Sequence, residues 1–83
     1  MSANGPHGRY APLRGTQSAV VRHLRRGDWT AGIPALAAAL RVPERNVWLA
    51  VESLDYRGLI RAQRREDGSL RLWITKFGRS IRL

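Results

Sequence analysis

Residues 33–56 read IPALAAAL, then RVP, then ERNVWLAVESLDY, and this stretch decides the fold. The first part, 33–40, is short and alanine-rich, and Pro34 is tolerated in the first turn of a helix. After the turn at 41–43, apolar residues recur three and four positions apart, which is the pattern of a helix with one buried face. These apolar residues are Val47, Ala50, Val51 and Leu54. The stretch therefore predicts two packed helices joined by a tight turn.

A further helix is predicted upstream, over residues 16–26. Thr16 is its expected N-cap, and Ala19, Val20, Val21 and Leu24 have helical spacing. Residues 1–14 contain a Gly-Pro-His-Gly run and little periodicity, so we expect an N-terminal arm with a docking segment at Tyr10 and Leu13. The link at 28–30 is short enough for one brief strand, and its Trp29 is assigned to the core.

The hydrophobic period changes from helical to alternating after Gly58, which is expected to end the helix over 44–57 in a left-handed conformation. Residues 59–65 and 70–74 read as strands, and the Asp-Gly pair between them is typical of a β-hairpin. Thr75 is a candidate cap for a last short helix. The predicted fold is mainly α with a small β-hairpin (α+β): a winged helix-turn-helix with a three-helix core and a two- or three-stranded wing, in one domain over 15–83.

Composition narrows the class of function. The chain has 83 residues, 15 Lys+Arg against 6 Asp+Glu, and a net charge of +9, which favours a polyanionic partner, most often nucleic acid. There is no cysteine, and the two histidines are far apart, so we expect no disulfide, no metal site and no cofactor. We identify no secretory signal, no membrane span and no catalytic grouping. The expectation is a non-enzyme that is cytoplasmic and nucleoid-associated.

The second helix of such a motif enters the major groove of DNA, and its first residues reach the base edges. Arg45 and Asn46 pair with guanine and adenine in such contacts, and Glu44 either accepts from cytosine or favours the helix terminus. The candidate major-groove residues are Glu44, Arg45, Asn46, Trp48, Leu49 and Glu52.

The hairpin supplies a second group of candidates, for contacts to the DNA backbone through the wing at 64–71. Basic residues at the helix-turn-helix turn and on the first helix are expected to add phosphate contacts. The candidate wing and backbone residues are Arg64, Arg65, Ser69, Arg71, Arg22, Arg25, Arg26 and Arg41. All basic residues except Lys76 are arginine, which suits bidentate contacts but equally reflects the codons of a GC-rich genome.

Two tryptophans fall on faces where polar residues are expected, namely Trp48 on the reading helix and Trp73 on the outer face of the second strand. Either the arm or the last helix shields them, or they form a protein interface together with Tyr10. A winged-helix protein-interaction module is therefore an alternative function, as is a DNA-architectural factor of a phage or plasmid.

Three motifs resemble the bacterial winged-helix transcriptional regulators. Residues 30–47 are similar to the family's "T…ELA..LGVS..TV" helix-turn-helix, and residues 54–60 to its "L…GLI" junction. Residues 72–79 resemble the "L.LT..G" ending of the multiple-antibiotic-resistance regulator (MarR) class. The resemblance implies sequence-specific binding to double-stranded DNA and repression of transcription. It also implies a homodimer where the operator is a palindrome.

The chain departs from that pattern at particular residues. Arg41 stands at the turn position where the family has glycine, and Pro43 stands where it has a Ser/Thr cap. Trp48 and Leu49 replace polar residues. We identify no counterpart of the long flanking helices that form the dimer and the effector pocket in the MarR class, so the resemblance is confined to the DNA-binding part.

Overall fold

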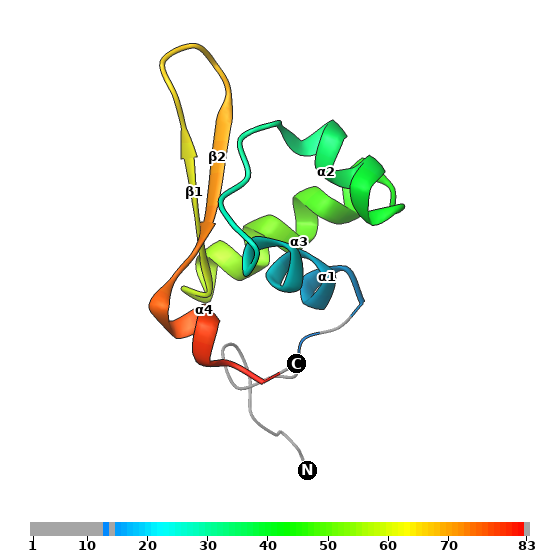
Figure 1. Cartoon of the computed structure of the whole chain (residues 1–83). Coiled ribbons are helices and arrows are strands. Elements are labelled where there is room, and N and C mark those ends of the chain that lie inside the picture. The colour runs from blue at the N-terminus through cyan, green and yellow to red at the C-terminus, as the bar shows by residue number, and fades with distance from the viewer. Residues whose placement is uncertain (1–12, 14, 83) are drawn as a thin grey trace.

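The computed structural model describes residue 13 and residues 15–82, and its elements follow the predicted order (Figure 1). They are α1 (Gly15–Leu24), α2 (Ile33–Leu40), α3 (Glu44–Tyr56), β1 (Ile60–Arg64), β2 (Leu70–Ile74) and α4 (Lys76–Ser80). The predicted α+β winged helix-turn-helix fold is confirmed. Of the proposed arm, Leu13 packs against the core, whereas Tyr10 lies outside the described residues.

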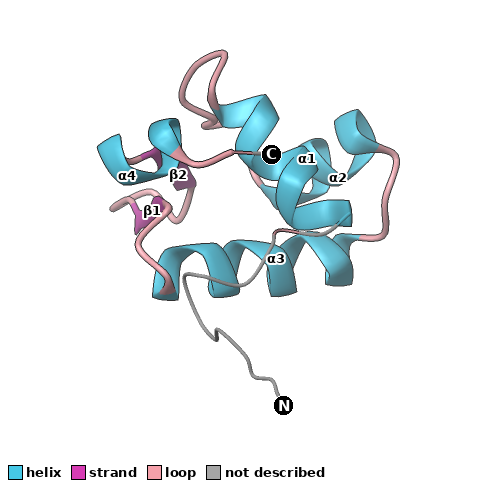
Figure 2. Cartoon of the chain, turned by 90° about the horizontal axis from the view of Figure 1, so that it is seen from below, coloured by secondary structure: helices cyan, strands magenta, loops and turns pink. Residues whose placement is uncertain are grey.

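The core lies where α1, α2 and α3 meet the base of the hairpin. α3 forms one side of the molecule, and α1 and α2 lie on its inner side (Figure 2). The predicted inward residues of α3 are all buried, and they pack with Val20, Val21 and Leu24 of α1 and with Leu36 of α2. Burial of these aliphatic side chains is the main force that holds the three helices together.

The turn between α2 and α3 is closed by Arg41, which adopts the left-handed conformation at φ 59° and ψ 45°. The Arg41 N–H donates to the carbonyl of Ala38, and the Val42 N–H donates to that of Ala37, which are the paired bonds of a Schellman cap. Pro43 follows in extended conformation at the N-cap of α3. Arg41 therefore occupies the glycine conformation of the turn at a steric cost.

The hairpin is an antiparallel pair in which Ile60 faces Ile74 and Ala62 faces Leu72. Trp29 adds a single bridge to Leu72 on the other side of β2, so the brief strand expected at 28–30 is reduced to one residue. Trp29 is half-buried against the core, and its indole N–H donates to the carbonyl of Gly32 at 2.8 Å.

Both ends of α1 differ from the prediction, whereas the predicted end of α3 and start of α4 are confirmed. α1 begins at Gly15, so Thr16 lies inside the helix and is not its N-cap, and α1 ends at Leu24 rather than at residue 26. The predicted left-handed Gly58 after α3 (φ 78°) is confirmed, and so is the Thr75 cap of α4, which accepts from the N–H of Gly78.

α4 lies tightly against the junction between α3 and β1. A Cβ atom placed on the buried Gly78 would lie 2.0 Å from the carbonyl oxygen of Leu59. The Thr75 N–H donates to that same carbonyl at 3.1 Å. Only glycine at position 78 allows α4 to approach this closely.

Candidate nucleic-acid interface

The outward face of α3 carries all six predicted major-groove residues. Because the opposite face of α3 is locked into the core, the orientation of this helix is determined by packing. Glu44, Arg45, Asn46 and Glu52 are exposed, and Trp48 and Leu49 keep 39% and 57% of their surface accessible. The first turn of α3 thus exposes both a guanidinium and an amide, which are the groups that pair with guanine and adenine.

Arg41 joins this group because the turn that contains it leads directly into α3. Its side chain is exposed, and only two residues separate it from Glu44. The structure therefore brings Arg41 and Arg45 to the same end of α3. Beside them, Asn46 and Leu49 line a shallow groove together with residues 15–17 at the start of α1.

The charge of α3 differs from what its predicted role suggests. The helix carries one arginine, Arg45, against three carboxylates, Glu44, Glu52 and Asp55. Glu44 lies in the first turn, where a negative charge stabilises the helix terminus. Glu52 and Asp55 lie further along, so the positive contribution of α3 to DNA binding is confined to its N-terminal end.

Tyr56, at the end of α3, was not predicted as a site residue, although 92% of its surface is exposed. It follows Glu52 by four residues and Leu49 by seven, so it continues the same exposed stripe. The helical period alone was sufficient to place it there. A tyrosine so exposed offers both a ring face and a hydroxyl group to a partner.

Arg64 and Arg65 are exposed on the wing, at and just after the end of β1. They line an open hollow between the hairpin and the link after α1, with Thr30, Gln63, Glu66, Asp67 and Arg71. Ser69, a predicted backbone contact, donates its hydroxyl to the Asp67 carboxylate at 2.6 Å. This bond, with the Ser69 N–H, lowers the pKa of Asp67. Ser69 therefore serves the turn at the tip of the wing.

Arg71 and Trp73 form a unit on the outer face of β2. The Arg71 guanidinium makes an ion pair with Asp28 at 2.6 Å and lies 4.6 Å from the centre of the Trp73 ring. Trp73 is half-buried, so the stacked arginine accounts for part of its cover. The positive charge of Arg71 is already balanced by a carboxylate, which leaves Arg64 and Arg65 as the unpaired cations among the predicted residues of the wing.

The three arginines at the end of α1 do not join this surface. α1 and α3 pack through their buried faces, so their exposed faces point away from each other (Figure 2). Arg22 and Arg26 are exposed on the α1 side, opposite to Arg45. The Arg25 guanidinium donates to the backbone carbonyls of Gly78, Arg79 and Ile81, so it holds α4 in place.

Within the described part of the chain, no group of three or more His, Asp or Glu side chains is placed to hold a metal ion. In the same residues, no helix is long and apolar enough to cross a membrane.

The fold and this surface define the class of the protein as a winged helix-turn-helix. Among solved structures, the chain is similar to a mutant form of ZitR from Lactococcus lactis, at 21% identity and a TM-score of 0.70, over 88% of this chain and 50% of that one. It is also similar to the adhesin competence repressor AdcR from Streptococcus pyogenes, at 21% identity and a TM-score of 0.68, over 78% and 48% of the two chains. The chain thus spans about half the length of these proteins. No family model and no curated protein matches it.

Proposed function

We propose that this chain binds double-stranded DNA as a repressor-like, MarR-like transcriptional regulator that is not an enzyme. The first turn of α3 enters the major groove, and the wing lies along the phosphate backbone. The observation that carries this proposal is the arrangement of Arg45 and Asn46 on the exposed end of a packed helix, beside a wing with exposed Arg64 and Arg65. The name of one structural neighbour, the AdcR repressor, supports repression as the outcome of binding.

The charge distribution refines the mode of docking. Phosphates repel Glu52 and Asp55, so the far end of α3 tilts out of the groove while its first turn enters it. Arg41, at the same end as Arg45, is then in reach of the phosphates at the rim of the groove. This docking uses the four exposed arginines Arg41, Arg45, Arg64 and Arg65.

The test is DNA affinity of the full chain, measured by fluorescence anisotropy on a duplex selected from a random library. Arg45→Ala is expected to weaken binding to the selected site by about 1–3 kcal/mol if Arg45 pairs with a guanine. Affinity is also expected to fall steeply with salt, because neutralised phosphates release their counterions.

Arg82→Ala is the matched control, because it removes the same charge from an exposed arginine that follows α4 and lies outside α3 and the wing. Equal losses from the two variants would contradict docking through α3. Binding that is absent, or insensitive to salt, would contradict the whole proposal.

A protein-interaction module is the second candidate, and the exposed face of α3 favours it. Trp48, Leu49 and Tyr56 are large, exposed and on one helix whose charge is negative overall. Aromatic side chains of this kind anchor protein interfaces, including homodimers. Under this function, Trp48→Ala abolishes self-association or partner binding and leaves affinity for DNA unchanged.

A further inference from the structure

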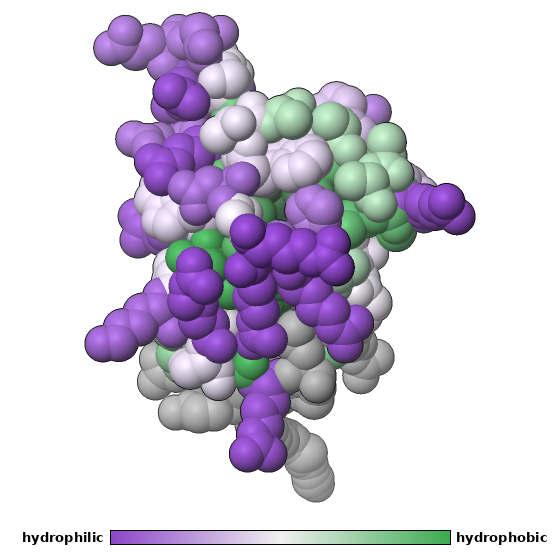
Figure 3. All heavy atoms as spheres, in the orientation of Figure 1, coloured by the Kyte–Doolittle hydropathy of each residue, from purple (hydrophilic) through white to green (hydrophobic). Residues whose placement is uncertain are grey.

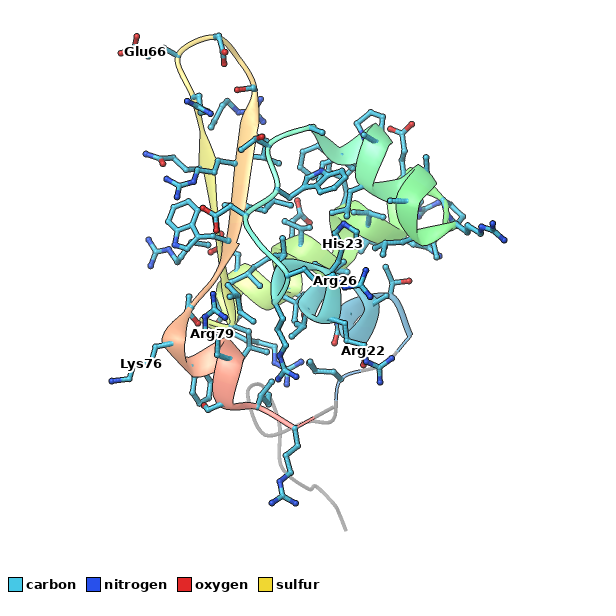
Figure 4. The ribbon with its side chains drawn as sticks, viewed as in Figure 1. Arg22, His23, Arg26, Glu66, Lys76 and Arg79 are labelled. Carbon is cyan, nitrogen blue, oxygen red and sulfur yellow. The ribbon has the colours of Figure 1, made fainter. Side chains whose placement is uncertain are left out.

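A second group of basic side chains lies away from α3 and the wing, on the side of the molecule that carries α1 and α4. Four exposed residues define this α1–α4 face: Arg22 and Arg26 from the end of α1, and Lys76 and Arg79 from α4. In the space-filling view, hydrophilic side chains cover this region (Figure 3). Arg22 and Arg26 extend from the α1 region and Arg79 from α4, whereas Lys76 extends outward from α4, away from α1 (Figure 4).

Arg25 is the residue that makes the two helices one surface. Its guanidinium donates to the carbonyl oxygens of Gly78 and Arg79, each at 3.4 Å, and to that of Ile81. These bonds tie the end of α4 to the end of α1, although more than fifty residues separate them in the chain. Because Arg25 is engaged with the backbone, the arginines that extend into solvent here are Arg22 of α1 and Arg26, two residues after its end.

The α1–α4 face is more positive than the outward face of α3. Neither α1 nor α4 contains an aspartate or a glutamate, whereas α3 contains three. The carboxylate that follows α1, Asp28, is already paired with Arg71. Long-range attraction follows the summed field of all charges, so a polyanion is drawn to this face as well as to the wing.

The two surfaces point in opposite directions. α1 buries Val20, Val21 and Leu24 toward α3, and α3 buries its own apolar stripe toward α1. A straight duplex on the outward face of α3 therefore leaves Arg22 and Arg26 uncovered. We propose that the α1–α4 face is a second phosphate-binding surface that holds another duplex DNA segment, so that one molecule bridges two duplexes.

The chemistry of the face favours DNA over an acidic protein as its occupant. Protein interfaces have an apolar, aromatic-rich centre with charges at the rim. Phe77 of α4 is an exposed apolar side chain beside them, but the four residues that define the face are cations on long side chains, which suits the regularly spaced phosphates of a duplex. This second surface goes beyond the regulator function proposed above, which needs only α3 and the wing.

The test compares two triple variants of the full chain, each of which removes three exposed arginines. The first, Arg22→Gln/Arg26→Gln/Arg79→Gln, changes the α1–α4 face and leaves the backbone carbonyls that bind Arg25 in place. The second, Arg45→Gln/Arg64→Gln/Arg65→Gln, changes α3 and the wing. Bridging is measured as capture of a fluorescent 30-base-pair duplex on beads that carry an unlabelled duplex of the same random sequence.

The wild-type chain is expected to capture the second duplex. The first variant is expected to lose at least about tenfold in capture while it still binds a single duplex. The second variant is expected to keep a weak, salt-dependent affinity for one duplex, with a log–log salt slope of about −2 to −3 if two or three phosphates remain neutralised. The single variant Arg26→Gln is also compared with the wild type. Its loss of duplex capture is expected to be smaller, and it perturbs folding least.

Four results would overturn the bridging proposal. The first is that the wild type captures no second duplex, and the second is that the first variant captures as much as the wild type. The third is that the wild type sediments as a dimer and the first variant as a monomer. The fourth is that polyglutamate competes with the labelled duplex as effectively as unlabelled DNA does. The third result identifies the face as a contact between copies, and the fourth identifies it as a surface for acidic protein. Loss of binding in the first variant but not in the second would instead refute docking through α3.

Discussion

Replacing Gly78 with alanine tests how tightly α4 is pressed against the junction between α3 and β1. The added Cβ would lie 2.0 Å from the carbonyl oxygen of Leu59 and 2.8 Å from Cγ1 of Ile74, whereas ordinary contacts begin at 3.4 Å. Backbone cannot yield as the end of a flexible side chain does, so α4 must move by more than 1 Å. Overpacking of this kind costs about 1–3 kcal/mol.

The same movement breaks hydrogen bonds that fasten the cap of α4. Thr75 donates its N–H to the Leu59 carbonyl at 3.1 Å and its hydroxyl to the Gly58 carbonyl at 2.7 Å. At about 1 kcal/mol for each bond, the total loss is about 3–5 kcal/mol. The whole free energy of unfolding of a domain this small is on the order of 5–10 kcal/mol, so Gly78→Ala is expected to lower Tm by at least about 12 °C.

Gly68→Ala, at the wing turn, is the control for this experiment. A Cβ there meets nothing within 4 Å, but φ is +87°, so alanine is strained without any clash. The expected cost is about 1–2 kcal/mol. Urea and thermal unfolding followed by far-UV circular dichroism measure both variants. A loss of less than about 1 kcal/mol in Gly78→Ala, or one no larger than in Gly68→Ala, would refute the close approach of α4.

Three other changes give sharp outcomes. Arg41→Gly is expected to raise the free energy of unfolding by up to about 1 kcal/mol, because relief of the left-handed conformation outweighs the added freedom of the unfolded chain; a lower urea midpoint would contradict this. Glu52→Gln is expected to tighten binding to random duplex about twofold to fivefold at low salt, as one repulsive charge is removed; weaker binding only to a selected site would mean that Glu52 accepts from a base. Because bonds from Ser69 lower the pKa of Asp67, the carboxylate stabilises the wing turn above its unfolded pKa near 3.8, and this contribution is lost only as the pH falls through the lower folded pKa. A Ser69 amide titration by NMR with its midpoint at or above 3.8 would contradict that bond.

Much of the fold followed from local pattern. The periods of α2, α3 and the hairpin predicted their bounds to within one residue, because each element buries one face of its own sequence. The ends of α1 were less well predicted. Arginines continue past Leu24 with a spacing that suits a helix, but the backbone bonds there tighten to three residues apart, from the Arg26 N–H to His23 and from the Gly27 N–H to Leu24.

The candidate site was predictable in its list of residues but not in its grouping. Periodicity placed Arg45, Asn46 and Glu52 on the outward face of α3, where the structure has them. It gave no information about Arg71, whose charge is balanced by Asp28 from forty-three residues earlier. Nor did it separate Arg22 and Arg26 from Arg45, since their distance apart depends on how α1 packs against α3.

The amino-acid sequence by itself determined the order and type of the elements, the left-handed turn after α3 and the excess of positive charge. These properties follow from neighbouring residues or from simple counts. Tertiary structure alone decided which cations are paired with a carboxylate and which cations lie on the same face of the molecule. It also decided how closely α4 approaches Leu59. Those features depend on contacts between segments far apart in the chain, so exposed cations that local pattern assigns to one surface lie in the folded chain on two faces, one on α3 and the wing and the other on α1 and α4.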